Sequence, residues 1–171
     1  VFVIFQLLIG SSGFKVLTSH IWYAFFSLAA LVILGLAMIF DFSPIDQTLS
    51  AAGHGTLALF GFMGMFAMGF ASILVPMFAL ANPASEGRSM FVMAVYGTGL
   101  ILCAFGVMAD QFEIAVLGTG LMLVGGVSHV LVMKTLMKKG MKKKLGISFV
   151  LIKTSWVLFP ISISAGIAAV S

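Results

Sequence analysis

Five stretches of this chain are long and apolar enough to cross a lipid bilayer as helices. They cover residues 20–40, 54–81, 89–109, 112–136 and 147–170. A helix needs about 20 mostly apolar residues to span the hydrocarbon core, where its backbone hydrogen bonds are satisfied internally. The composition agrees, because only 8% of the residues are charged, whereas a soluble domain has about 25%. The sequence therefore predicts an all-α, polytopic transmembrane helix bundle with the lipid bilayer as its surroundings.

The residues between these stretches predict short connections within one domain. Residues 41–46 and 82–88 each contain a proline among polar residues, and the pair at 110–111 predicts a tight hairpin. The apolar start, residues 1–9, is too short to span, and it has neither an initiator Met nor the pattern of a signal peptide. We expect a single transmembrane domain over residues 1–171 that is a segment of a longer protein.

Charge divides the predicted connections into two groups. The six lysines between Lys134 and Lys144, with Lys15 and Arg88, fall on one side of the bundle, and the connections on the other side carry only acids. The positive-inside rule then predicts a multi-pass protein of the bacterial inner membrane with the 134–144 loop in the cytoplasm. The alternative for the lysines is a binding patch for anionic lipid or nucleic acid. We interpret the lysines as a signal of membrane topology and predict no nucleic-acid partner.

Small residues recur in the third and fourth predicted spans. Gly97-Thr98-Gly99 is echoed by Gly118-Thr119-Gly120, and we interpret both as places where neighbouring helices approach closely. The one cysteine, Cys103, lies in an apolar stretch. It is predicted to be a small buried residue and offers neither a disulfide nor a thiolate metal site.

The three histidines are the main candidates for chemistry within the spans. His54 opens the second predicted span on the outer side, and its helix face continues through Ala58 and Gly61. Small side chains beside an imidazole leave room for a flat group such as haem; the alternative is an interfacial histidine above a packing face. His20 and His129 lie on the cytoplasmic side, where they could meet and share a ligand. Their alternatives are an interfacial position for His20 and a satisfied hydrogen bond for His129.

The second span resembles the second helix of haem-copper oxidase subunit I. The likeness rests on His54-Gly55 followed by Phe60, on Gly69-Phe70, and on the exit Val75-Pro76-Met77. NnrS-type membrane proteins show a similar span. The resemblance covers about residues 54–90 and implies that His54 is an axial ligand of a low-spin haem b. The further histidines of an oxidase active site and a second haem ligand are absent from this stretch of sequence, so oxygen reduction by this chain alone is excluded.

Two hypotheses of function follow. The first is a haem-binding, oxidase-like or NnrS-like membrane protein in electron transfer or haem-linked sensing, with His54 as the metal ligand. Its further cofactor-binding candidates are Ala58, Gly61, His129 and His20. The alternative is a non-catalytic structural subunit of a respiratory or other energy-transducing complex, whose partners are other membrane subunits or helices. A third hypothesis, a small-molecule transporter, lacks a polar site in mid-membrane. No catalytic residue is predicted, and whether the protein is an enzyme stays open.

Overall fold

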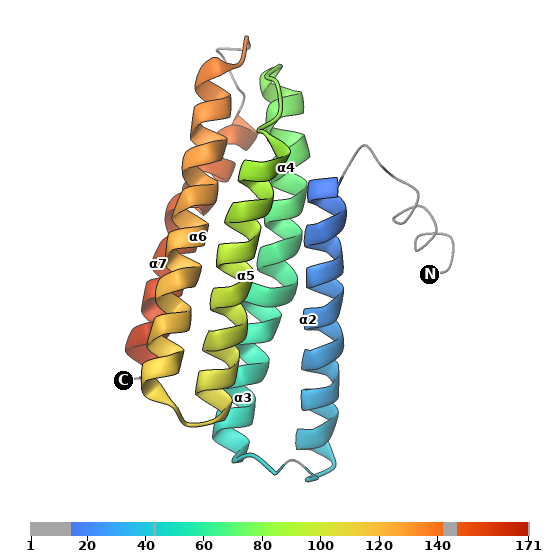
Figure 1. Ribbon diagram of the computed structural model, residues 1–171, viewed down its shortest axis with the longest axis vertical. Coiled ribbons are helices and arrows are strands. Elements are labelled where there is room, and N and C mark those ends of the chain that lie inside the picture. Colours follow the sequence, from blue (N-terminus) through green and yellow to red (C-terminus); the bar gives the residue numbers. More distant parts are fainter. Residues whose placement is uncertain (1–14, 43, 142–146, 171) are drawn as a thin grey trace, which may run out of the picture.

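The chain is a bundle of long helices (Figure 1). The structure, a computed structural model, describes residues 15–42, 44–141 and 147–170. Its elements are α2 (Lys15–Ile39), α3 (Gln47–Thr56), the π-helical segment η1 (Leu57–Gly64), α4 (Met65–Ala79), α5 (Glu86–Met108), α6 (Phe112–Lys139) and α7 (Ile147–Val170). Because α3, η1 and α4 follow one another without a break, they form one long helix of 33 residues. The predicted all-α helical bundle is confirmed.

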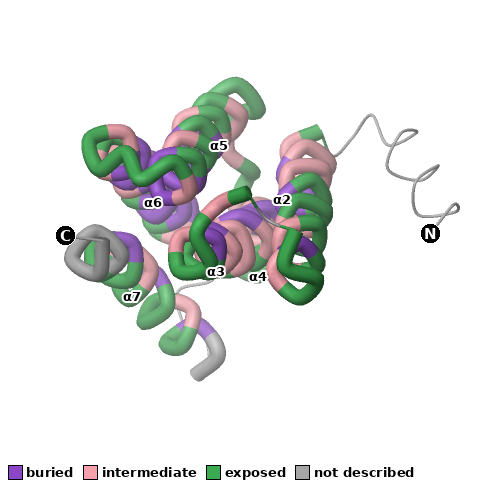
Figure 2. The backbone as a smooth tube through the Cα atoms, turned by 90° about the horizontal axis from the view of Figure 1, so that it is seen from below, coloured by how far each residue is buried: buried purple, intermediate pink, exposed green. Residues whose placement is uncertain are grey.

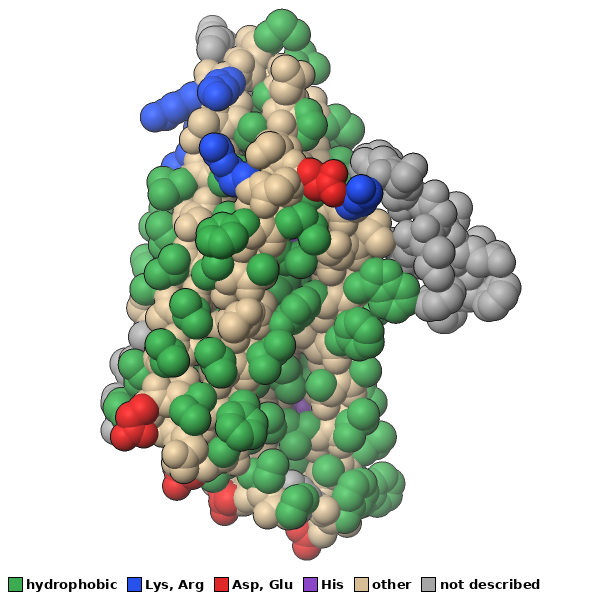
Figure 3. Space-filling view, viewed as in Figure 1, with side chains coloured by type: hydrophobic (Ala, Val, Ile, Leu, Met, Phe, Trp, Pro, Cys, Tyr) green, Lys and Arg blue, Asp and Glu red, His purple; other side chains and the backbone are tan. Residues whose placement is uncertain are grey.

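The bundle is embedded in a membrane. Within the described residues, four helices are long and apolar enough to cross it: α2, the continuous helix Gln47–Ala79, α5 and α6. In α7 the described apolar part, Phe149–Ala165, is shorter. Large apolar side chains cover the outside of the bundle between its two charged ends (Figure 3). A surface of this kind suits lipid, since water would not solvate it.

The second long helix begins earlier than the sequence analysis predicted. It starts at Gln47 instead of residue 54, because Asp46 acts as its N-cap and accepts hydrogen bonds from the backbone N–H groups of Thr48 (2.8 Å) and Leu49 (3.4 Å). The prediction that His54 opens this helix is therefore wrong. His54 lies about two turns inside it.

The charged residues lie at opposite ends of the bundle, as Figure 3 shows. Lys15, Arg88 and the described lysines of α6 gather at one end, here called the basic end. The other end, here called the acidic end, carries Asp41, Asp46 and Asp110 of the connections and Glu113 in the first turn of α6. One acid, Glu86, lies at the basic end, where it forms an ion pair with Lys15 (3.7 Å).

The centre of the bundle is the pair α5 and α6, which approach closely through glycines. A Cβ atom at Gly118 would lie 2.7 Å from both the Cα atom of Cys103 and the carbonyl oxygen of Gly99. The interpretation of the glycines as close-approach positions is thus confirmed for Gly97, Gly99 and Gly118, but it is wrong for Gly120, where a Cβ atom would meet nothing within 4 Å. Cys103 is buried, with 8% of its surface exposed.

The other helices pack around this pair. Figures 1 and 2 place α2 and α7 on opposite sides of the bundle, and buried residues concentrate between α4, α5 and α6. The peripheral position of α2 is reflected in its burial: 22% of its apolar window is buried, against 50% for α5. Tyr96 of α5 contacts both η1 and α7. Its hydroxyl donates to the carbonyl of Phe60 in η1 (3.1 Å), and its ring lies 5.9 Å from that of Phe159 in α7.

Candidate functional site

His54 packs against α2 in the half of the bundle toward the acidic end. A Cβ atom added to Gly35 of α2 would lie 3.1 Å from the Cε1 atom of the His54 ring. The Nδ1 atom of His54 is buried and, among the described residues, is the one buried side-chain nitrogen or oxygen without a hydrogen-bond partner. Leaving such a group unpaired costs about 1–3 kcal/mol. The ring as a whole is half-buried.

The helix face beside His54 is partly filled by its neighbours. A Cβ atom at Gly61 would lie 2.7 Å from the hydroxyl oxygen of Ser27 in α2 and 3.2 Å from the Leu100 side chain in α5. Ala58, one turn nearer His54, belongs to the same η1 segment. At Gly61 the room for a flat group that the sequence suggested is therefore taken up by Ser27 and Leu100, whereas Ala58 is partly exposed.

His20 and His129 meet in the opposite half of the bundle. His20 of α2 is 2% exposed, and its Nδ1–H donates to the carbonyl of Val16 (2.7 Å). His129 of α6 is 8% exposed and makes no hydrogen bond to a described residue. Together with Ser72 and Ser89, the two rings line a cavity of about 10 Å³, which is the space of about one water molecule. His20 is enclosed by the bundle, and the interfacial position considered for it stays a prediction.

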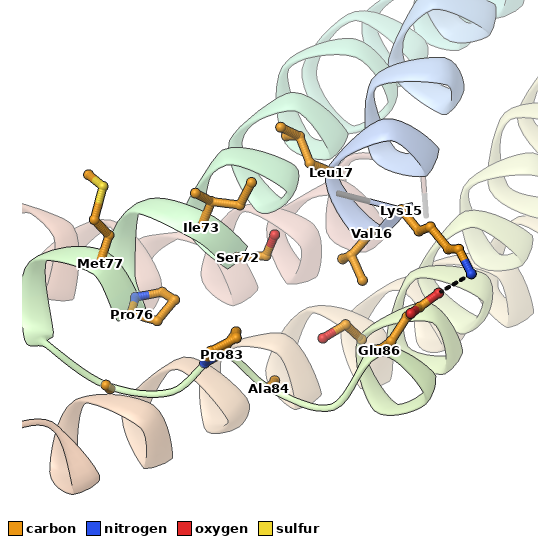
Figure 4. Close-up of a pocket in the computed structure, with 12 residues that line it drawn as sticks. Lys15, Val16, Leu17, Ser72, Ile73, Pro76, Met77, Pro83, Ala84 and Glu86 are labelled. Atoms are coloured by element: carbon orange, nitrogen blue, oxygen red, sulfur yellow. Dashed lines mark ion pairs between the residues drawn. The ribbon is translucent and has the colours of Figure 1, made fainter. Parts of the chain in front are cut away.

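This small cavity adjoins a larger pocket at the basic end (Figure 4). The pocket has a volume of about 400 Å³ and lies between α2, α4 and the start of α5, and it shares Val16, Ser72 and Ser89 with the cavity. The ion pair between Lys15 and Glu86 stands beside it with both side chains more than half exposed. An ion pair so exposed contributes little to stability.

On its other side, His129 lines a groove between α4, α6 and α7 with a volume of about 310 Å³. The walls carry small residues of α4 and the aromatic side chains Trp156 and Phe159 of α7. This groove, Ser72, Ser89 and Trp156 could not be recognised as parts of a site from the sequence. Isolated serines and aromatics are common in membrane helices, and nothing in their spacing shows that they meet.

The described residues contain no group of three or more His, Cys, Asp or Glu side chains that could hold a metal ion. A haem iron at His54 would need a second protein ligand from elsewhere, because His20 and His129 line a cavity in the opposite half of the bundle. No protein-family model, curated protein or solved structure matches the chain. The oxidase-like or NnrS-like resemblance thus stays a prediction.

Proposed function

We propose that this chain is a haem-binding integral membrane protein that acts in electron transfer or haem-linked sensing within a larger membrane complex. One observation carries the proposal: the half-buried His54 has a buried Nδ1 without a hydrogen-bond partner among the described residues. Coordination of haem iron would use the other ring nitrogen, Nε2. Metal-bound histidines donate their other N–H to an acceptor, so the loaded protein is expected to hold a water or carbonyl beside Nδ1.

The packing limits where such a haem could lie. Because Ser27 fills the space beside Gly61, the haem would lie against the outside of the bundle, where a neighbouring helix or subunit supplies the second axial ligand. His54 belongs to the half toward the acidic end. Under the positive-inside rule that half faces outward, with the 134–144 loop in the cytoplasm and the protein in the bacterial inner membrane.

The test is a reduced-minus-oxidised absorption spectrum of the protein solubilised mildly with its native partners. We expect a b-type α band that His54→Ala abolishes and that His54→Met, which keeps a ligand, shifts in wavelength. His129→Asn is the matched control, because it changes a histidine in the opposite half of the bundle and is expected to keep the band. Loss of the band in His129→Asn but not in His54→Ala would refute His54 as the ligand.

The filled space beside Gly61 favours a second candidate, a non-catalytic structural subunit of a respiratory or other energy-transducing complex. On this alternative the small residues of η1 serve only to pack the helix against its neighbours α2, α5 and α7. The wild-type complex would then contain no haem band that depends on this chain. The protein would still migrate with its partner subunits in a native gel.

A further inference from the structure

The groove between α4, α6 and α7 lies at membrane depth and opens to lipid. Its walls include Phe70 and Leu74 of α4, whose side chains are exposed on the apolar surface of the bundle. Small α4 residues, Ala67 and Ala71, face it, and α7 contributes Trp156. The volume of about 310 Å³ is at the lower end of the range for small-molecule sites. A molecule of modest size could therefore enter it from the bilayer.

His129 contributes a polar group to this groove. Its side chain is more than nine-tenths buried, has no hydrogen bond to a described residue, and lines both the groove and the small cavity that it shares with His20. Its ring therefore stands between the two spaces. Two other side chains of the groove carry a donor: Ser155, which already donates its hydroxyl hydrogen to the carbonyl of Ile152 (2.8 Å), and Trp156, with its indole N–H. His129 and Trp156 are left as hydrogen-bond donors for an occupant, and of the two only the imidazole can also accept a hydrogen bond.

These features select the chemistry of the occupant. It must dissolve in lipid, offer a flat ring to the aromatic wall, and carry an acceptor for an imidazole N–H. An acyl chain has no acceptor at this depth. We propose that this groove binds a lipid-soluble quinone, whose ring carbonyl accepts a hydrogen bond from His129 and whose apolar tail lies in the bilayer.

The cavity behind His129 suits a ligand that exists as quinone and as quinol. Because the Nδ1–H of His20 is held by the carbonyl of Val16, its Nε2 is left to bond a water in the cavity of about 10 Å³. A water bound between the two rings would let His129 donate to a carbonyl or accept from a quinol hydroxyl, according to its tautomer. Ser72 and Ser89 line both this cavity and the pocket at the basic end, so polar side chains extend from His129 to that pocket.

The site is independent of any haem at His54, and tryptophan fluorescence can test it. The chain has two tryptophans, so Trp22→Phe leaves Trp156, in the groove wall, as the one fluorophore of its kind. The purified full chain in lipid nanodiscs is titrated with decylubiquinone. We expect saturable quenching in the Trp22→Phe protein and affinity about tenfold weaker once His129→Leu removes the hydrogen bond.

A pair of alanine variants separates the groove from unspecific partitioning. Ala67→Phe fills the groove and is expected to abolish saturation, whereas Ala29→Phe, on the exposed surface of α2, is expected to leave it unchanged. Quenching that rises linearly with quinone concentration, or saturation that Ala67→Phe does not alter, would overturn the site. Equal affinity in the His129→Leu protein, or equally effective competition by decylbenzene, which has the tail and ring without carbonyls, would overturn the assignment to a quinone.

Discussion

Gly118 and Gly120 lie on the same helix, α6, but meet opposite surroundings. A Cβ atom at Gly118 would fall against the backbone of Cys103 and 2.7 Å from the carbonyl oxygen of Gly99. A Cβ atom at Gly120 would meet nothing within 4 Å. The substitutions Gly118→Ala and Gly120→Ala therefore add the same methyl group to one helix, with and without a clash.

The expected difference in stability follows from these contacts. Overpacking costs about 1–3 kcal/mol, and the clash at Gly118 is with backbone atoms that cannot rotate away, so we expect about 3 kcal/mol of destabilisation. At Gly120 the higher helix propensity of alanine should stabilise by about 0.5–1 kcal/mol. The variants then differ by about 3.5–4 kcal/mol, or roughly 7–16 °C in the midpoint of thermal unfolding for a chain of this size.

The single cysteine provides the assay. Cys103 is 8% exposed, so a thiol-reactive fluorophore should label it only after unfolding, and a thermal ramp in detergent reports the midpoint. Because Cys103 lies beside Gly118, tryptophan fluorescence is recorded in parallel to separate global unfolding from local opening. Midpoints of the two variants within 2 °C of each other would show that the α5–α6 contact is not as close as described.

Three other predictions concern hydrogen bonds and orientation. Tyr96→Phe removes the bond to the carbonyl of Phe60 and should cost about 1 kcal/mol, or about 2–4 °C in the thermal midpoint. Hydrogen bonds from backbone N–H groups, that of Thr48 first, lower the pKa of Asp46 in the folded protein below its ordinary value of 3.8. The ionised carboxylate therefore stabilises the fold above pH 3.8, and this stabilisation is lost as the pH falls through the lower pKa of the folded state. The thermal midpoint of the wild type should thus fall relative to Asp46→Asn only below about pH 4, and a constant difference from pH 6 to pH 3 would contradict this. For orientation, Lys139→Cys in a Cys103→Ala background should react with a membrane-impermeant maleimide in inverted vesicles and not in intact cells.

The main architecture could be predicted from the sequence because it depends on local properties. Hydrophobic length predicts where helices lie, and the distribution of Lys, Arg, Asp and Glu over the connections predicts the basic and acidic ends. The early start at Gln47 was also within reach, since Asp46 is a good N-cap residue. It was missed because residues 47–53 are only weakly apolar, and their membership of the helix depends on hydrogen bonding more than on hydropathy.

The candidate sites could not be predicted in this way. The sequence correctly marked Gly61 as small, but only the packed bundle decided that Ser27 fills the space beside it. The sequence likewise left open whether His20 and His129 meet, and the structure brings them to one cavity of about 10 Å³. The groove lined by His129 and Trp156 exists only because of the way α7 packs against α4 and α6. In a bilayer, apolar residues that face lipid look the same as those that face another helix, so hydropathy fixes which segments are helices and only tertiary packing decides which of their faces meet.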